Sequence, residues 1–196
     1  MSTKEHINRI IDRTFTVIQD VYNKQKEVGG VPNIKPLSRI LFPQKRKEPV
    51  RVSEQELRFI FVEQLNIEIQ QGWDVYYSIE TPTLGKYDFR NNGAIISEDG
   101  QSASFDLVIH DKNYQRIALI EFKAKNAGSH EHLKDFVKLT NPDEGSNICC
   151  YFIEIIEGYD KGTIRSLKKK VQSFDNVEFR CWSLNKSEDI TEEILN

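Results

Sequence analysis

Two apolar segments near the middle of the chain, residues 104–110 (SFDLVIH) and 118–125 (ALIEFKAK), are separated by a short polar stretch. Both are rich in β-branched and aromatic residues, and the intervening DKNYQ is typical of a turn, so the pattern predicts a β-hairpin. Apolar residues occupy both faces of each segment, as in strands at the centre of a sheet that is covered on both sides. The chain is therefore expected to fold around a covered sheet.

Three charged residues interrupt this apolar hairpin: Asp106, Glu121 and Lys123. If the turn is centred on Asn113 and Tyr114, Asp106 lies directly across from Glu121, and directly opposed Cβ atoms are ~5 Å apart. Lys123 shares the face of Glu121, displaced by roughly 7 Å along the strand. Opposed like charges are unfavourable, and buried charges are costly without partners. A divalent cation between the carboxylates would remove both penalties, so the pattern favours a metal site over a cross-strand salt-bridge cluster.

The other expected elements alternate helix and strand. Apolar residues at helical spacing predict a helix over 4–27, and a proline-containing connector then runs to about residue 52. Ser53 and Glu56 have the spacing of a capping box, which predicts a second helix to about residue 71. The remaining expectations are a strand over 73–80, a long loop over 81–103 with a minor strand near 94–96, a helix over 129–139, a strand over 148–155, a helix over 161–174 and a strand over 177–182.

The order of these elements predicts an α/β fold with a mixed sheet. A helix separates the hairpin from strand 148–155, which permits a parallel, right-handed crossover, whereas the hairpin itself is antiparallel. Residues 53–196 are expected to form a domain with a mixed central sheet flanked by helices, and residues 1–52 to add an N-terminal helix and connector. The 196 residues suffice for one proper core.

Composition limits the classes of protein. No apolar run approaches the roughly 20 residues that span a bilayer. The N-terminus lacks the apolar core of a signal peptide, so a cytoplasmic location and no membrane partner are expected. The net charge of −3 means that any binding of nucleic acid depends on local basic patches. The candidate patches are residues 45–47 with Arg51, residues 168–170 near Arg165, and the lysines around the hairpin.

The element order of residues 53–157, with Asp106, Glu121 and Lys123 on its second and third strands, resembles the PD-(D/E)XK nuclease superfamily. The resemblance implies the restriction-endonuclease-like fold, with an αβββαβ core. One departure is Phe105, which stands where the motif's name has proline, a position that varies within the family.

The resemblance implies a nuclease that depends on Mg²⁺, with Mn²⁺ as a substitute. Asp106 and Glu121 would be metal ligands, the backbone carbonyl of Phe122 a further one, and Lys123 would orient or activate the attacking water. Family members often add a glutamate from the helix before the first strand. Glu56 is the first choice, with a capping-box role as its alternative, and the other candidates are Glu54 and Glu63.

The expected substrate is DNA, with RNA as an open alternative, and a homodimer would allow cuts in both strands of a duplex. Residues 81–103 and the basic helix 161–174 are expected to encode substrate choice. The alternative function is a catalytically silent protein of the nuclease fold that binds nucleic acid or another protein. A third interpretation is a structural α/β domain with an incidental acidic cluster.

Several other polar residues carry weaker signals. His130 and His132 lack further zinc ligands at a recognisable spacing and are expected in the first turn of a helix capped by Ser129. Lys125 should project near the site, either contacting phosphate or remaining solvated. Lys138 is a candidate phosphate contact by resemblance, with a surface position as its alternative. The expected buried, inert thiols are Cys149, Cys150 and Cys181.

Overall fold

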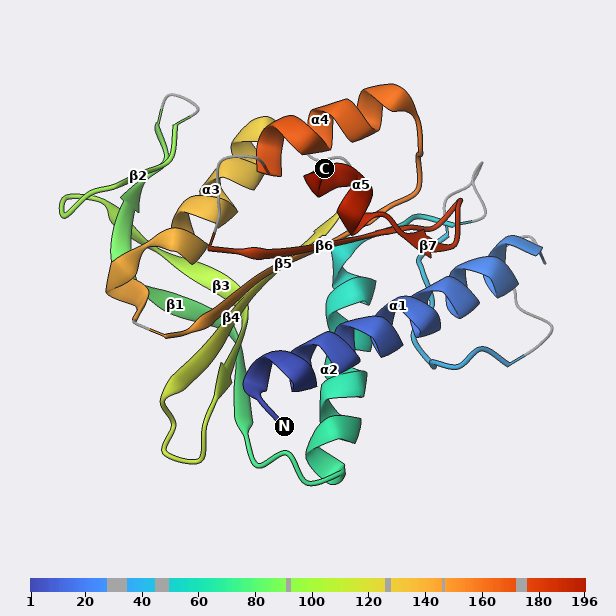
Figure 1. Cartoon of the computed structure of the whole chain (residues 1–196), viewed down its shortest axis with the longest axis horizontal. Helices are drawn as coiled ribbons and strands as arrows, with labels where there is room; N and C mark the ends of the chain where they lie inside the picture. The colour runs from blue at the N-terminus through green and yellow to red at the C-terminus, as the bar shows by residue number, and fades with distance from the viewer. Residues whose placement is uncertain (28–34, 45–49, 91–92, 126–127, 146, 172–175) are drawn as a thin grey trace.

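The computed structural model describes residues 1–27, 35–44, 50–90, 93–125, 128–145, 147–171 and 176–196 (Figure 1). It is a mixed α/β protein in which N-terminal helices precede a seven-stranded mixed sheet with interspersed helices. The strands are ordered β2-β1-β3-β4-β5-β6-β7 across the sheet. Their bounds are β1 Tyr76–Asp88, β2 Ile95–Ile96, β3 Gln101–His110, β4 Arg116–Ala124, β5 Cys149–Ile156, β6 Glu178–Ser183 and β7 Glu188–Asp189.

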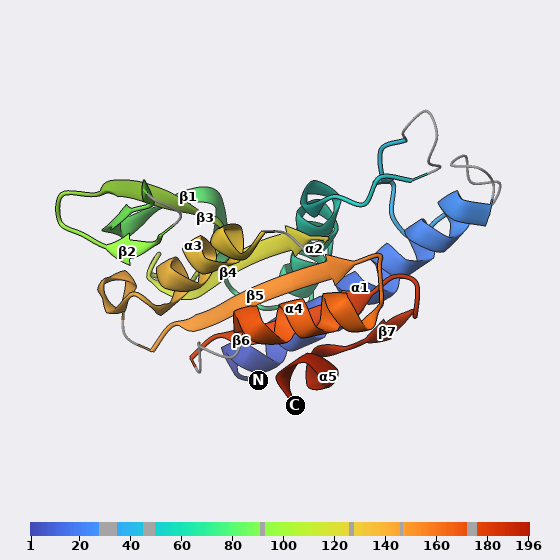
Figure 2. The same ribbon diagram turned by 90° about the horizontal axis from the view of Figure 1, so that it is seen from above.

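The two N-terminal helices, α1 Thr3–Glu27 and α2 Glu54–Gln70, lie on one side of the sheet (Figures 1 and 2). Their apolar side chains share one core with side chains of β3, β4 and β5. The described part of residues 1–52 therefore packs into the core of the sheet rather than standing apart from it. No helix in the described ranges is both long and apolar enough to cross a membrane.

The opposite side of the sheet is covered by α3 Ser129–Thr140, α4 Lys161–Val171 and α5 Thr191–Leu195 (Figure 2). These helices form a second core with the other face of the central strands. β4 and β5 are parallel and are joined through α3, whereas β3 and β4 are antiparallel. The predicted mixed sheet with helices on both faces is thus confirmed.

The register of the β3–β4 hairpin follows the sequence prediction where the strands pair. The pairs Ile109↔Ala118, Val108↔Leu119 and Leu107↔Ile120 have the predicted alignment, and an irregularity next to the turn shifts the pairing at His110↔Arg116. The ladder ends at Leu107↔Ile120, so Asp106 and Glu121 are the next positions along the two strands. The sheet therefore places the two carboxylates at the end of the ladder.

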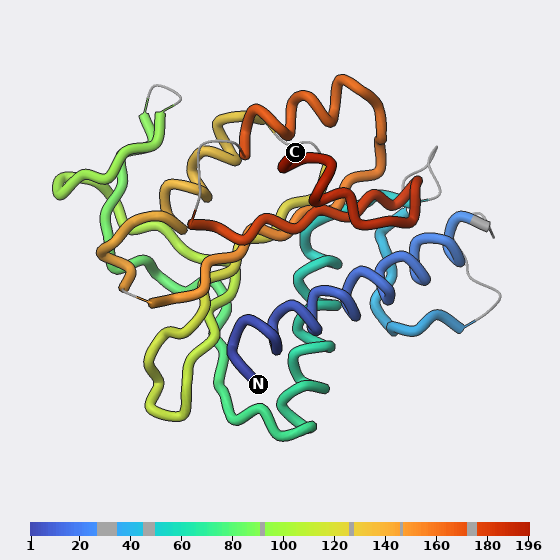
Figure 3. The backbone as a smooth tube through the Cα atoms, viewed as in Figure 1, coloured from blue at the N-terminus to red at the C-terminus, as the bar shows by residue number. Residues whose placement is uncertain are grey.

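The expected long loop over residues 81–103 is wrong. Most of this segment is strand, because β1 continues to Asp88, β2 spans Ile95–Ile96 and β3 begins at Gln101; Figure 3 traces the backbone of these strands. The pairing of β1 with β3 shifts register between Pro82 and Lys86. The turn-forming residues of this irregular part are the reason why the sequence predicts a loop. The sequence also did not predict β7 and α5, and the N-cap of α3 is Gly128 rather than Ser129.

Candidate functional site

The end of the β3–β4 ladder brings Asp106 and the strand β4 backbone into direct contact. Asp106 Oδ2 accepts a hydrogen bond of 2.7 Å from the backbone N–H of Phe122. The N–H and C=O of one strand residue point toward the same neighbouring strand. The Phe122 carbonyl is therefore directed toward the edge where Asp106 lies, as the predicted ligand role requires. The Phe122 ring lies on the face of the sheet that α1 and α2 cover, where it packs against Phe61.

Helix α3 supplies two charged side chains to the same place. Lys138 Nζ lies 2.5 Å from Glu121 Oε1 and 2.9 Å from Asp135 Oδ1, and it donates a 2.9 Å hydrogen bond to the carbonyl of Ser104. The side chains of Glu121, Asp135 and Lys138 are all more than nine-tenths buried. Lys138 is therefore a buried partner of the predicted metal ligand Glu121, not a surface lysine.

Lys123 forms the other half of this ion network. Its Nζ lies 2.8 Å from Asp135 Oδ2 and 3.8 Å from Glu54 Oε2. Asp135 thus contacts one lysine with each of its carboxylate oxygens. Near Asp106, the guanidinium of Arg58 lies 3.5 Å from Oδ1 and also pairs with Glu80.

Burial and neighbouring charges shift the acid–base properties of the network. Burial, the nearby Asp135 and then Asp106 raise the pKa of Glu121 well above its usual value, and Lys138 offsets only part of this effect. Burial alone would lower the pKa of Lys123, but Asp135 and Glu54 raise it above its usual value. Lys123 is therefore positively charged at neutral pH, and Glu121 retains a proton more readily than an exposed glutamate does.

The structure brings Glu54, rather than Glu56, to the network. Glu56 forms a hydrogen bond with Ser53, and Glu63 accepts one of 2.7 Å from Ser38. Burial raises the pKa of Glu54, Lys123 opposes the shift, and Asp106 and Asp135 add to it, which places Glu54 within electrostatic reach of the cluster. Glu54, rather than the first choice Glu56, is therefore the helix glutamate that contacts the network; Glu56 binds the Ser53 hydroxyl, although Ser53 forms no side-chain capping hydrogen bond to the helix backbone.

The oxygen ligands at this site, two carboxylates and one backbone carbonyl, suit Mg²⁺ better than a metal that needs many protein ligands. Within the described ranges, no group of three or more His, Cys, Asp or Glu side chains is arranged to hold a metal ion. Mg²⁺ is commonly bound through one or two carboxylates and keeps several waters. Asp106, Glu121 and the Phe122 carbonyl match that demand. Glu121 Oε1 and Asp135 Oδ2 are buried, and each pairs with a lysine ammonium group.

Two further candidates are His132 and Lys125. His132 Nε2 lies 3.1 Å from Glu154 Oε2, and both side chains are fully buried. Lys125 directly follows β4 and is exposed, which leaves its two alternative roles open.

Of the three cysteines expected to be buried, only Cys181 is buried, and Cys149 and Cys150 are half-buried. Burial raises the pKa of all three thiols, with that of Cys150 at about 11. A thiol with a raised pKa is a poor source of the nucleophilic thiolate.

Asp135 and Arg58 were not predicted from the sequence. The only sequence signal for Asp135 is its position three residues before Lys138, which places both on one face of a helix. Recognising the signal requires knowing which face of α3 packs on β4. Arg58 lies one turn after Glu54, and its relevance likewise depends on how α2 is docked.

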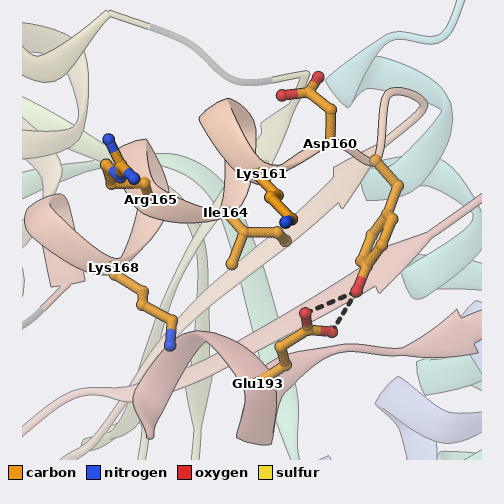
Figure 4. Close-up of a pocket in the computed structure, with 7 residues that line it drawn as sticks. Asp160, Lys161, Ile164, Arg165, Lys168 and Glu193 are labelled. Carbon is orange, nitrogen blue, oxygen red and sulfur yellow. Dashed lines mark hydrogen bonds between the residues drawn. The ribbon is translucent and has the colours of Figure 1, made fainter.

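A separate hollow of about 320 Å³ lies between α4 and α5 (Figure 4). Its lining includes Ile164 and Tyr159, whose hydroxyl donates to the carboxylate of Glu193. Three basic side chains of α4 line it: Lys161, Arg165 and Lys168. This is the basic helix for which the sequence predicted a role in substrate choice, and that role stays a prediction. The other candidate basic patch, residues 45–47, lies outside the described residues.

Comparisons of the chain with protein-family models, with curated proteins and with solved structures find no match.

Proposed function

We propose that this chain is a Mg²⁺-dependent nuclease of the PD-(D/E)XK type that hydrolyses phosphodiester bonds, with DNA as the expected substrate. The observation that carries the proposal is the convergence of Asp106, Glu121 and Lys123 at the end of the β3–β4 ladder. Charged groups buried on an otherwise apolar sheet face are costly, so their presence calls for a function.

The order of elements supports the same proposal. Helix α2, strands β1, β3 and β4, helix α3 and strand β5 follow one another as helix, three strands, helix and strand, with the two-residue β2 as an addition. This order is the one expected of the αβββαβ core in the proposed restriction-endonuclease-like fold. The carboxylates lie on its second and third long strands, as the superfamily pattern requires.

Asp106 and Glu121 would hold the metal ion, together with the Phe122 carbonyl. A bound Mg²⁺ lowers the pKa of its water and stabilises charge on phosphate oxygens. Mn²⁺ has the same preference for oxygen ligands and should substitute.

Lys123 contributes a fixed positive charge beside the metal ligands. Asp135 holds its ammonium group, and Glu54 lies on its more exposed side. From there Lys123 can donate a hydrogen bond to a phosphate oxygen or to the attacking water. Glu54, rather than Glu56, is the helix glutamate that we assign to the site.

One observation favours a second candidate, a catalytically silent protein of this fold that binds nucleic acid or another protein. Glu121, Asp135 and Asp106 each lie within 3.5 Å of a lysine or arginine nitrogen. A network of this kind can also be a structural device. The two candidates differ in whether Asp106 and Lys123 are needed for cleavage or only for folding.

The test is a cleavage assay with plasmid, linear duplex, single-stranded DNA and RNA, each with Mg²⁺, Mn²⁺ or EDTA. The nuclease proposal expects cleavage that EDTA abolishes and that Asp106→Asn and Lys123→Met both lose. The exposed residues Asp74 and Lys35 provide matched controls, since Asp74→Asn and Lys35→Met should cleave at the wild-type rate. Binding without cleavage in every metal, unchanged in the variants, would instead support the silent module.

A further inference from the structure

The charged side chains of the site form a row in which carboxylates alternate with ammonium groups. Glu54 faces Lys123, Lys123 contacts Asp135, Asp135 contacts Lys138, and Lys138 contacts Glu121. Each of the first two gaps between successive carboxylates therefore already contains a lysine nitrogen.

The third gap, between Glu121 and Asp106, differs from the other two. Among the residues that the structure describes, no lysine or arginine nitrogen forms an ion pair with both of these carboxylates. The guanidinium of Arg58, from α2, lies 3.5 Å from Asp106, and of these two carboxylates Lys138 pairs with Glu121 alone. The two carboxylates are nevertheless neighbours, because they follow the last ladder pair and Asp106 Oδ2 accepts a 2.7 Å hydrogen bond from the backbone N–H of Phe122, the residue after Glu121. This gap is consequently the place in the row where an added cation has two carboxylate ligands.

Lys138 is held in its gap by more than one contact. Its Nζ has three oxygen atoms within 2.9 Å, from Glu121, Asp135 and the Ser104 carbonyl, and an ammonium group has three N–H donors. The side chain is 8 % exposed. A metal ion in this gap would have to displace an ammonium group that already lies among three protein oxygens.

Charge balance points in the same direction. The row has four carboxylates, and three cations lie beside them, namely Lys123, Lys138 and Arg58. Glu80, which also pairs with Arg58, lies at the exposed rim. Counted with all four carboxylates ionised, one divalent ion would change the charge of the row from one net negative to one net positive. A second divalent ion would leave three positive charges in a buried place, which is strongly unfavourable.

We propose that the site takes one divalent cation per chain, between Asp106 and Glu121, and that Lys138 sets this number by occupying the gap between Glu121 and Asp135. The inference rests on the proposed function and specifies the metal content of that same site. The ammonium group of Lys138 occupies the position between Glu121 and Asp135 at which a second metal ion would otherwise have two carboxylate ligands.

The experiment is a count of bound Mn²⁺ by electron paramagnetic resonance of the free ion during titration of the full chain. Wild type should bind one Mn²⁺, and Lys138→Gln should bind two. Lys134→Gln is the matched control, because Lys134 lies one turn earlier on α3 and contacts the Phe89 ring instead. It should bind one ion, whereas Asp106→Asn should lose it.

The outcomes separate the inference from the proposed function. Two ions bound by wild type, or one bound by folded Lys138→Gln, overturns the inference and leaves the nuclease proposal standing. No ion bound by wild type contradicts the metal site and with it the nuclease proposal. Circular dichroism establishes that the variants are folded. If Lys138→Gln is not, Lys138→Met replaces it, and the wild-type count tests the stoichiometry independently of either variant.

Discussion

Asp135 explains how two lysines can lie side by side in a buried place. Like charges repel, yet Lys123 and Lys138 each contact a different oxygen of the same carboxylate. Asp135 therefore fixes the position of Lys123 relative to Glu121. Asp106, Glu121 and Lys123 could be predicted because strand periodicity alone aligns them. Asp135 could not, because the partner of a helix residue depends on how the helix packs.

The raised pKa of Glu121 leads to a prediction about how this single residue affects the pH dependence of folding stability. Its side chain is 2 % exposed, and burial together with Asp135 disfavours its ionised form in the metal-free protein. The folded state then holds the Glu121 proton to higher pH than the unfolded state, where glutamate has a pKa of about 4.3. The stability that this proton provides is present below that value and is lost as pH rises through the folded pKa.

We therefore expect the melting temperature of metal-free Glu121→Gln, minus that of wild type, to increase as pH rises from acid to neutral. Glu157→Gln, a change of a carboxylate outside this network, is the control and should show no such trend. Thermal melts in EDTA over a series of pH values measure the difference. A difference that stays constant or decreases with pH contradicts the assigned environment of Glu121.

At the scale of elements, α1 and α2 are joined by an ion cluster around one buried glutamate. Glu68 of α2 is 1 % exposed and pairs with His6 at 2.6 Å, with Arg9 at 3.3 Å and with Arg13. Burial alone would raise the pKa of Glu68, but hydrogen bonds from His6 and Arg13 hold it below its usual value. The cluster therefore fastens the N-terminal helix to the helix that begins at Glu54.

Glu68→Ala should lower the free energy of unfolding by about 2–3 kcal/mol at neutral pH, because it removes a buried charge and leaves its partners uncompensated. Urea denaturation measures the change, and Gln70→Ala, at an exposed position of the same helix, is the control. Since the Glu68 pKa is lowered, its contribution is present above about pH 4.3 and is lost as pH falls through the folded pKa. An equal effect at pH 3 and pH 7 would contradict this explanation.

Helix α4 carries exposed basic residues next to the hollow of Figure 4, and this leads to a prediction about nucleic acid. Arg165→Gln/Lys169→Gln should weaken DNA binding and reduce the slope of log affinity against log salt by roughly 0.9 for each phosphate that the variant no longer neutralises. Fluorescence anisotropy at several salt concentrations measures both quantities.

The matched double variant Lys35→Gln/Arg39→Gln removes the same charge at exposed positions of the connector between α1 and α2. It should leave the salt slope nearer to that of wild type. Equal slopes for the two double variants would show that α4 does not lie along the path of the DNA.

The extent of strand β1 shows why some elements escape prediction from sequence. Pro82 and Gly85 suggest a loop, but Glu144 accepts hydrogen bonds of 2.9 Å from the backbone N–H groups of Leu84 and Gly85. A Cβ at Gly85 would lie 2.1 Å from the side chain of Asn141, so this close approach needs glycine. These partners are distant in sequence, and no local pattern reveals them. The hairpin and the apolar strand β5 could be predicted because their own residues determine them.

At the scale of the whole molecule, one sheet separates two cores, and α1 belongs to the first of them. Buried residues of α1 pack in the same core as residues of α2 and of the central strands. The expected division at residue 52 thus describes the order of elements along the chain, while the packing joins the two parts.

We predict that residues 53–196 alone lose cooperative unfolding, because removal of α1 exposes apolar surface that it covers in the full chain. Circular dichroism during thermal denaturation of this fragment and of the full chain measures the effect. A fragment that melts cooperatively at the temperature of the full chain would show that the N-terminal part is an independent addition.

The proposed function depends above all on Asp106 and Glu121 forming a metal-dependent active site. The sharpest test is the rate at which the full chain cleaves end-labelled duplex DNA in Mg²⁺, compared with Asp106→Asn under the same conditions. We expect cleavage by wild type that EDTA abolishes, and no cleavage by the folded variant. Equal cleavage by both proteins, or none by folded wild type in either Mg²⁺ or Mn²⁺, would show that these carboxylates do not form such a site.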